Sequence, residues 1–129
     1  MHRLLLACAA LLVAHAPIAG AEVPDSLMGR GVSRALAEYR AARIANVRYA
    51  LSLDLSRSRD TAYGTARIRF TRRSGGDVIL DFRGPKLGRV RVDGAPVAAE
   101  FNGAHIRIPA ARVRAGANVV DVEFAALVA

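Results

Sequence analysis

Apolar and polar residues alternate along two long stretches in the middle of the chain. Between Val47 and Ser56 the odd-numbered positions are apolar and the even-numbered positions are polar or small. The same period of two recurs from Ala62 to Arg72. This period is typical of a β-strand with one buried and one solvated face. The two stretches therefore predict an antiparallel pair of strands, each burying its apolar side.

Shorter apolar stretches, separated by turn residues, follow as far as the last strand. Asp93-Gly94 and Asn102-Gly103 are residue pairs typical of tight hairpin turns, because both types tolerate positive φ. Together with the turn residues Ser74–Asp77 and Gly84-Pro85 and the connector Pro109–Ala117, they separate five further strands, at residues 78–82, 87–92, 95–101, 105–108 and 118–124. Short strands with such frequent turns predict an all-β fold, an antiparallel β-sandwich or barrel.

One short helix is predicted ahead of the strands. Ser33 is a suitable N-cap, and the period of 3.6 that follows it continues to about Ala45. Residues 22–32 contain a proline and two glycines and are interpreted as a flexible lead-in. We expect the helix to cover an open end of the β domain.

The first residues have the features of an export signal. Arg3 precedes an apolar run that ends near Ala14, and Ala19-Gly20-Ala21 is a small-residue cleavage site. The run is shorter than the roughly 20 residues that a membrane span needs. Residues 1–21 are therefore predicted to be a signal peptide that directs the chain to the periplasm or outside the cell, with no membrane attachment after cleavage. A lipoprotein signal ending at Cys8 is the less favoured alternative, because little hydrophobic sequence precedes that cysteine.

Charge and composition narrow the range of functions. The formal net charge is +8, with Lys86 the single lysine among 19 basic residues. The arginines are scattered over alternating strand positions, and three Tyr, four Phe and no Trp leave few rings on which bases could stack. We therefore expect no nucleic-acid partner.

Residues 22–129 offer few groups for chemistry. His105 is their only histidine and Cys8 lies in the signal, so a His/Cys zinc site cannot be assembled. The zinc-peptidase motif His-Glu-x-x-His and the serine-hydrolase motif Gly-x-Ser-x-Gly are both absent. His105 alternates with Arg107 and is predicted on a wet or edge face. The carboxylate pairs Asp121/Glu123 and Asp77/Asp81 are interpreted as solubilising charges. No catalytic, cofactor-binding or metal-binding residue is assigned.

Several segments, in order, resemble the start of a known enzyme family. They are Ala42–Leu55, Tyr63–Phe70, Leu80–Phe82, Val90–Gly94, Ile106–Pro109 and Gly116–Phe124. Together they resemble the amino-terminal domain of the aminopeptidase N (M1) family of zinc metallopeptidases. The resemblance implies that residues 33–129 are part of a saddle-like β-sandwich, which acts as scaffold and as wall of the peptide-binding cleft.

The resemblance also implies what lies elsewhere in a complete enzyme. A thermolysin-like catalytic domain would hold the zinc and contact the peptide substrate. The sequence ends at Ala129, before the family's substrate-gripping groups and zinc motif, so no functional residue is carried over and the chain alone should be inactive. A fragment, a split gene or an early stop is the favoured explanation. The alternative is a stand-alone periplasmic β-sandwich that acts as a binding or interaction module.

Overall fold

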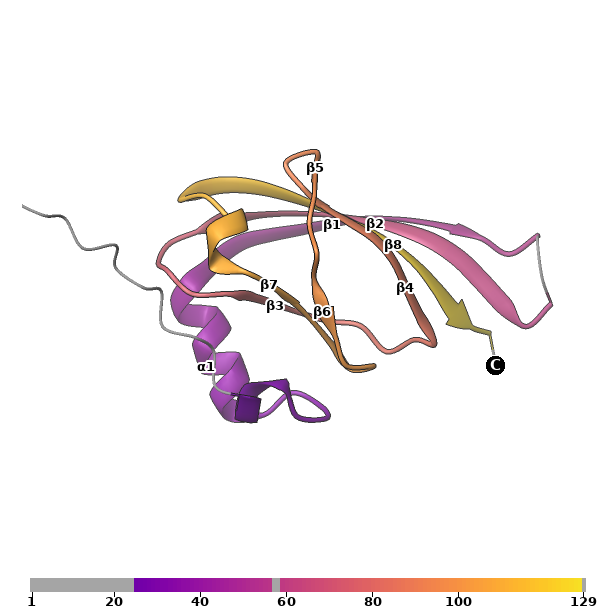
Figure 1. Ribbon diagram of the computed structural model, residues 1–129, viewed down its shortest axis with the longest axis horizontal. Coiled ribbons are helices and arrows are strands. Elements are labelled where there is room, and N and C mark those ends of the chain that lie inside the picture. Colours follow the sequence, from indigo (N-terminus) through magenta and orange to yellow (C-terminus); the bar gives the residue numbers. More distant parts are fainter. Residues whose placement is uncertain (1–24, 57–58, 129) are drawn as a thin grey trace, which may run out of the picture.

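The computed structural model describes residues 25–56 and 59–128, which form two open antiparallel sheets and one short α-helix (Figure 1). This confirms the predicted mostly β, antiparallel chain with one helix. The predicted signal peptide (1–21) and the lipoprotein alternative at Cys8 lie outside the described residues. None of the helices in the described ranges is long and apolar enough to cross a membrane.

The larger sheet contains five strands, with β1 at one edge and the very short β5 at the other. Neighbouring strands are antiparallel throughout. In spatial order the strands are β1 (Ile44–Asp54), β2 (Thr61–Arg72), β8 (Gly116–Leu127), β4 (Lys86–Val92) and β5 (Ala95–Pro96).

The smaller sheet has three short strands and lies below the larger one in Figure 1. Its order is β3 (Val78–Asp81), β7 (His105–Ile108) and β6 (Glu100–Phe101). The remaining elements are the helix α1 (Arg34–Arg43) and two 3₁₀ helices, η1 (Asp25–Met28) and η2 (Ala110–Arg112).

Two apolar clusters hold the layers together. The main cluster lies between the sheets, and its buried members are Ile68, Phe70, Val78, Leu80, Val90, Val92, Ile106, Ile108, Val113, Val120 and Val122. A second cluster lies on the opposite side of the small sheet, where Ile79 packs against Leu36 of α1 and Met28 of η1. The uniformly apolar β3 is therefore buried on both faces, which explains why it lacks the alternation of the longer strands.

The predicted helix start is confirmed. The side chain of Ser33 accepts a hydrogen bond of 3.1 Å from the backbone N–H of Leu36, and the helix begins at Arg34. It ends at Arg43, two residues before the predicted end, because Ile44 already has extended backbone angles and pairs with Arg72 of β2.

The structure contradicts the sequence predictions at two strands. No residue of β1 is buried, although the alternation predicts one buried face. The predicted strand 95–101 is two separate pieces, β5 and β6, which belong to different sheets. Pro96 is the last residue of β5, although the backbone N–H of Val97 still donates to the Val90 carbonyl at 2.9 Å. The predicted lead-in contains η1, and Met28 is buried there.

Candidate functional site

A row of exposed apolar side chains runs along β1 and into the turn that follows it. We call this row the β1 strip. Its side chains are between 40% and 70% exposed, although each is large and apolar. Its members are Val47, Tyr49, Leu51, Leu53 and Leu55. A contiguous apolar row of this kind on a sheet is a surface that commonly contacts another molecule.

The β1 strip lies on the core side of the large sheet. In the β1–β2 ladder Tyr49 is opposite Ile68, and Ile68 belongs to the main cluster. Directly opposed residues of antiparallel strands point to the same face. Leu53 is opposite Gly64, and a Cβ at Gly64 would lie 2.9 Å from Cδ2 of Leu53. The strip is thus an extension of the inner face rather than part of the outer, charged face.

The strip is exposed because the layer beneath it is too small. The three strands of the small sheet have two to four residues each, against eleven and twelve in β1 and β2. In Figure 1 the β1–β2 hairpin extends well beyond the small sheet, and α1 lies at the other end. No described element covers the strip.

A groove opens where the strip meets the helix and the small sheet. Its volume is about 400 Å³. Ile44, Val47 and Tyr49 line it from β1, Ile79 and Leu80 line it from β3, and β2 contributes the floor. Its lining is mainly apolar, so the groove is suited to apolar side chains of another segment or chain.

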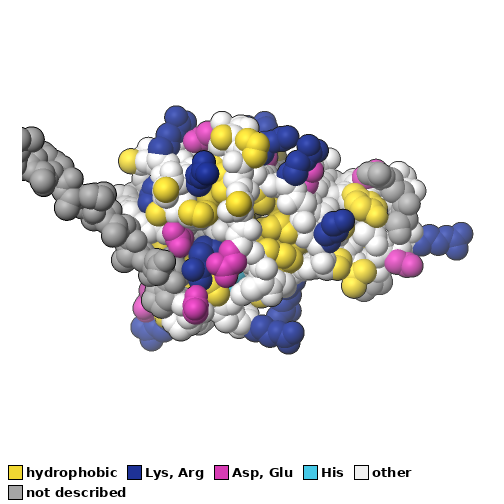
Figure 2. All heavy atoms as spheres, in the orientation of Figure 1, with side chains coloured by type: hydrophobic (Ala, Val, Ile, Leu, Met, Phe, Trp, Pro, Cys, Tyr) yellow, Lys and Arg dark blue, Asp and Glu magenta, His cyan; other side chains and the backbone are white. Residues whose placement is uncertain are grey.

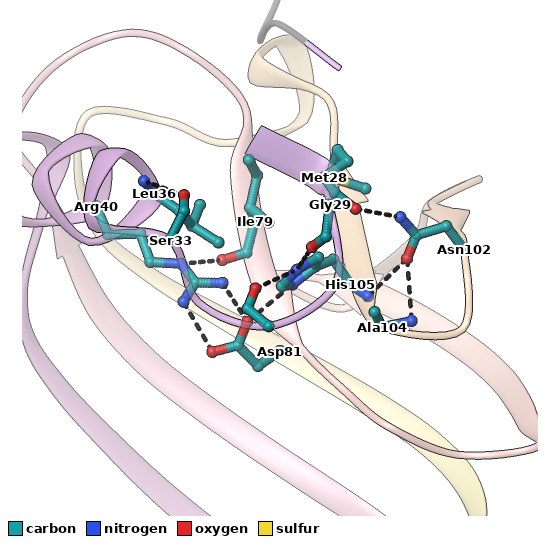
Figure 3. A network of polar contacts seen from close by, with 11 residues as sticks. Met28, Gly29, Ser33, Leu36, Arg40, Ile79, Asp81, Asn102, Ala104 and His105 are labelled. Carbon is teal, nitrogen blue, oxygen red and sulfur yellow. Dashed lines mark hydrogen bonds and ion pairs between the residues drawn. The ribbon is translucent and has the colours of Figure 1, made fainter. Parts of the chain in front are cut away.

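A polar network borders this groove (Figure 3). Arg40 Nη1 and Nη2 donate to the two carboxylate oxygens of Asp81 at 2.8 and 2.7 Å, and its Nε donates to the Ile79 carbonyl at 2.9 Å. The Arg40 hydrogen bonds hold the pKa of the Asp81 carboxyl below its usual value, although partial burial opposes them. Because Arg40 lies on α1 and Asp81 on β3, the pair fastens the helix to the small sheet.

His105 is buried at the centre of the network, and its predicted place on a wet or edge face is wrong. The residue is 1% exposed and lies in the central strand of the small sheet. Its Nε2 lies 2.7 Å from the Gly29 carbonyl oxygen and 3.0 Å from that of Gly31. Carbonyl oxygens only accept hydrogen bonds, so Nε2 carries a proton. The residues after η1 cover the face of β7 that was predicted to meet water.

The second ring nitrogen faces a carboxylate. His105 Nδ1 lies 2.8 Å from Oδ1 of Asp81, and this contact adds to the effect of Arg40 in lowering the pKa of the Asp81 carboxyl. Asn102 completes the network, because its Nδ2 donates to the Met28 carbonyl and its Oδ1 accepts from the His105 backbone. The imidazole thus anchors residues 29–31 against the small sheet, with both nitrogens occupied by protein groups.

Zinc does not fit the residues that the structure describes. His105 is the only histidine in residues 25–128, and its ring has no nitrogen directed to an open site. Within the same described ranges, no three His, Cys, Asp or Glu side chains are grouped so that they could hold a metal ion. We derive no chemical step through zinc for this chain.

The carboxylates that were interpreted as solubilising charges have basic or backbone partners. Asp121 accepts from Arg67 at 2.7 and 3.1 Å, and this lowers its pKa, whereas Glu123 pairs with Arg89 at 3.1 Å. Asp77 accepts from the backbone N–H of Ala110 at 2.8 Å. Each carboxylate has its own basic or backbone partner, so none forms an acid–base pair with a second carboxylate.

Arginine and lysine side chains are spread over the whole face seen in Figure 2, between separate apolar patches.

The sequence did not indicate the polar network around His105, and its pattern gave the wrong burial for the β1 strip. Arg40 and Asp81 are 41 residues apart, so no local pattern links them. The strip was visible as an alternating apolar row, but the pattern predicted its burial.

No family model matches the chain, and no curated protein matches it significantly.

Proposed function

We propose that this chain is the amino-terminal, non-catalytic β domain of an exported aminopeptidase N-like (M1) zinc metallopeptidase. In this proposal residues 33–129 belong to a saddle-like β-sandwich that supports the catalytic domain and forms part of the wall of the peptide-binding cleft. The zinc and the substrate contacts belong to the thermolysin-like catalytic domain, and residues 1–21 act as the export signal. The ordered resemblance of the segments in Ala42–Phe124 supports the proposal.

The observation that carries the proposal is the β1 strip. Five large apolar side chains on the core side of the sheet are between 40% and 70% exposed. Burying a Leu side chain contributes roughly 1.5–3 kcal/mol, so a covering domain would be stabilised by contact with the strip. A scaffold domain that supports a larger partner needs a surface of this kind.

Two measurements test the proposal. The DNA after the codon for Ala129 should encode His-Glu-x-x-His in one of its frames. The purified chain, supplied with zinc, should not hydrolyse an aminoacyl anilide above the blank, and co-expression with the downstream frame should yield a complex that does. Hydrolysis by the chain alone that survives His105→Ala, or the absence of such a frame, would contradict the proposal.

The second candidate is a stand-alone periplasmic β-sandwich that acts as a binding or interaction module. It is favoured by the main cluster, whose members come from both sheets and are at most 8% exposed, and by the network that anchors residues 29–31. The downstream sequence, together with the solubility and unfolding of the purified chain, separates the two candidates. A chain that is soluble and unfolds cooperatively by itself, with no downstream zinc motif, would support the second.

A further inference from the structure

A polar cavity opens beside the network around His105, at the turn between β6 and β7. Its volume is about 350 Å³. The turn residues 102–104 form one wall, and Arg83 after β3 and Arg30 after η1 complete the lining. None of the lining residues that the structure describes is Asp or Glu. This cavity, which we call the arginine cavity, therefore presents two positive charges and no negative charge.

Neither arginine of the cavity is neutralised by the protein. Arg30 and Arg83 take part in none of the ion pairs or side-chain hydrogen bonds within the described ranges. The groove beside the β1 strip and the hollow lined by Arg67 and Asp121 differ, because their arginines lie beside carboxylates of the same lining. Two like charges that share a cavity repel each other, and an anion between them relieves the repulsion.

The backbone on both sides of Arg30 is held by the buried imidazole. His105 Nε2 lies 2.7 Å from the Gly29 carbonyl oxygen and 3.0 Å from that of Gly31 (Figure 3). Because one ring nitrogen holds both flanking carbonyls, the backbone position of Arg30 is fixed. A ligand therefore has to order only the side chain of Arg30, which lowers the entropy cost of binding.

The opposite wall of the arginine cavity is fixed as well. The backbone N–H of Phe82, the residue before Arg83, donates to the Ala104 carbonyl at 3.0 Å. Within the turn, Asn102 Oδ1 accepts from the Ala104 N–H at 3.0 Å. Gly103 has a φ of 86°, and its own N–H donates to no protein group in the part of the chain that the structure describes. The cavity thus offers a free backbone donor in addition to two guanidinium groups.

These donors match the chemistry of a phosphate group. A guanidinium presents a planar set of N–H donors that can bind two oxygens of one phosphate. A phosphate monoester carries about −1.5 to −2 charges at pH 7 and three acceptor oxygens, so it can neutralise both arginines, whereas a carboxylate carries one charge. The volume of about 350 Å³ is close to the lower end of the range for small-molecule sites, so a small organic group can accompany the phosphate.

We propose that Arg30 and Arg83 form a binding site for a phosphate group, either free as inorganic phosphate or esterified to a small molecule. The two guanidinium groups bind the phosphate oxygens, and the N–H of Gly103 is the third donor. The inference does not depend on the proposed function, because every lining residue belongs to this chain and none belongs to the β1 strip.

Titration of the full chain with inorganic phosphate, followed by the backbone amide signals in NMR spectra, tests the site. At pH 7.5 and constant ionic strength the N–H signal of Gly103 should shift saturably, with a dissociation constant on the order of 1 mM. Arg30→Gln and Arg83→Gln should each raise this constant at least about tenfold, because each removes a charge-assisted contact. Circular dichroism would verify that both variants are folded.

Arg48→Gln is the matched control. It removes the same charge from an exposed position on β1 that does not line the cavity, and it should leave the dissociation constant within about twofold of the wild type. An equal loss in Arg48→Gln would overturn the proposal, because it would show general attraction of anions to a basic protein. The absence of a saturable shift up to about 50 mM phosphate would overturn it as well.

Two further probes identify the chemistry of the ligand. Tighter binding of glycerol 3-phosphate than of inorganic phosphate would assign the site to an ester, and the reverse order would assign it to the free ion; both results support the site. Acetate should bind at least about fivefold more weakly than phosphate, because it carries a single charge. Equal affinities for acetate and phosphate would contradict a phosphate site.

Discussion

At the scale of the residue, the buried polar side chains show what local patterns can and cannot indicate. Alternation along β7 correctly places His105 on the face opposite Ile106. Ile106 packs in the main cluster, while His105 points to the other side of the small sheet. The sequence pattern has no information about residues 29–31, which are more than 70 positions away and cover that side. The face of β7 on which His105 lies was therefore predictable, and the burial of its imidazole was not.

The Arg40–Asp81 pair should make stability depend on acid pH. The folded-state pKa of Asp81 lies below its unfolded value, so its contribution is complete above the unfolded pKa of about 3.9 and is lost as the pH falls through the folded pKa. Asp81→Asn should lower the free energy of unfolding by about 1 kcal/mol at neutral pH, a modest figure because the Asp81 side chain is 47% exposed. The variant should also lose less stability than the wild type between about pH 4 and pH 2.

Urea unfolding followed by circular dichroism at several pH values measures this effect. Glu38→Gln is the matched control, because the Arg34–Glu38 pair has side chains that are 92% and 65% exposed and should contribute little. Parallel pH profiles for Asp81→Asn and the wild type would show that the carboxylate does not stabilise the fold.

At the scale of the element, the residue types in a turn predict the backbone conformation of one hairpin fully and of another only in part. Asp93 and Gly94 both have positive φ, 48° and 85°, which confirms the predicted tight turn between β4 and β5. Asn102-Gly103 has the same residue types, but only Gly103 has positive φ, at 86°. There the Asn102 side chain accepts from the backbone N–H groups of Ala104 and His105, so the connection is wider. Similar residue pairs thus form different turns when the first side chain hydrogen-bonds the backbone of the residues that follow, as Asn102 does.

The packing of β2 against β8 depends on a glycine. A Cβ at Gly64 would lie 2.5 Å from Cζ of Phe124 and 2.9 Å from Cδ2 of Leu53, and the Phe124 ring packs against Phe82 at a centroid distance of 5.2 Å, so the ring would have to shift. Gly64→Ala should therefore lower the free energy of unfolding by about 1–3 kcal/mol. Gly75→Ala is the control, because the nearest atom to its Cβ would be 4.0 Å away, and it should change stability by less than about 0.5 kcal/mol. Chemical denaturation measures both, and equal stability of the two variants would contradict the close approach.

At the scale of the whole molecule, the layers and their sizes decide which predicted faces are buried. Alternation identified both long strands and their apolar sides, and the β1–β2 pairing was predictable from them. The alternation gives no information about the size of the layer that packs against those apolar sides. The small sheet meets the β1 strip through β3 at the groove, and the four residues of β3 leave Leu51, Leu53 and Leu55 exposed. The candidate site arises from this difference in layer size, which no single segment encodes.

The same difference predicts that neighbouring apolar residues contribute very differently to stability. Leu51 is 61% exposed, whereas Ile68 on the adjacent strand is 5% exposed. Leu51→Thr should change the free energy of unfolding by less than about 0.5 kcal/mol and reduce the binding of an apolar fluorescent dye. Ile68→Thr should lower it by at least about 2 kcal/mol, because it removes buried methyl groups and buries a hydroxyl. Urea unfolding of both variants at one low protein concentration measures the contrast. A loss for Leu51→Thr as large as that for Ile68→Thr would mean that the strip is already covered in solution, and the surface proposed to contact a partner would not be free.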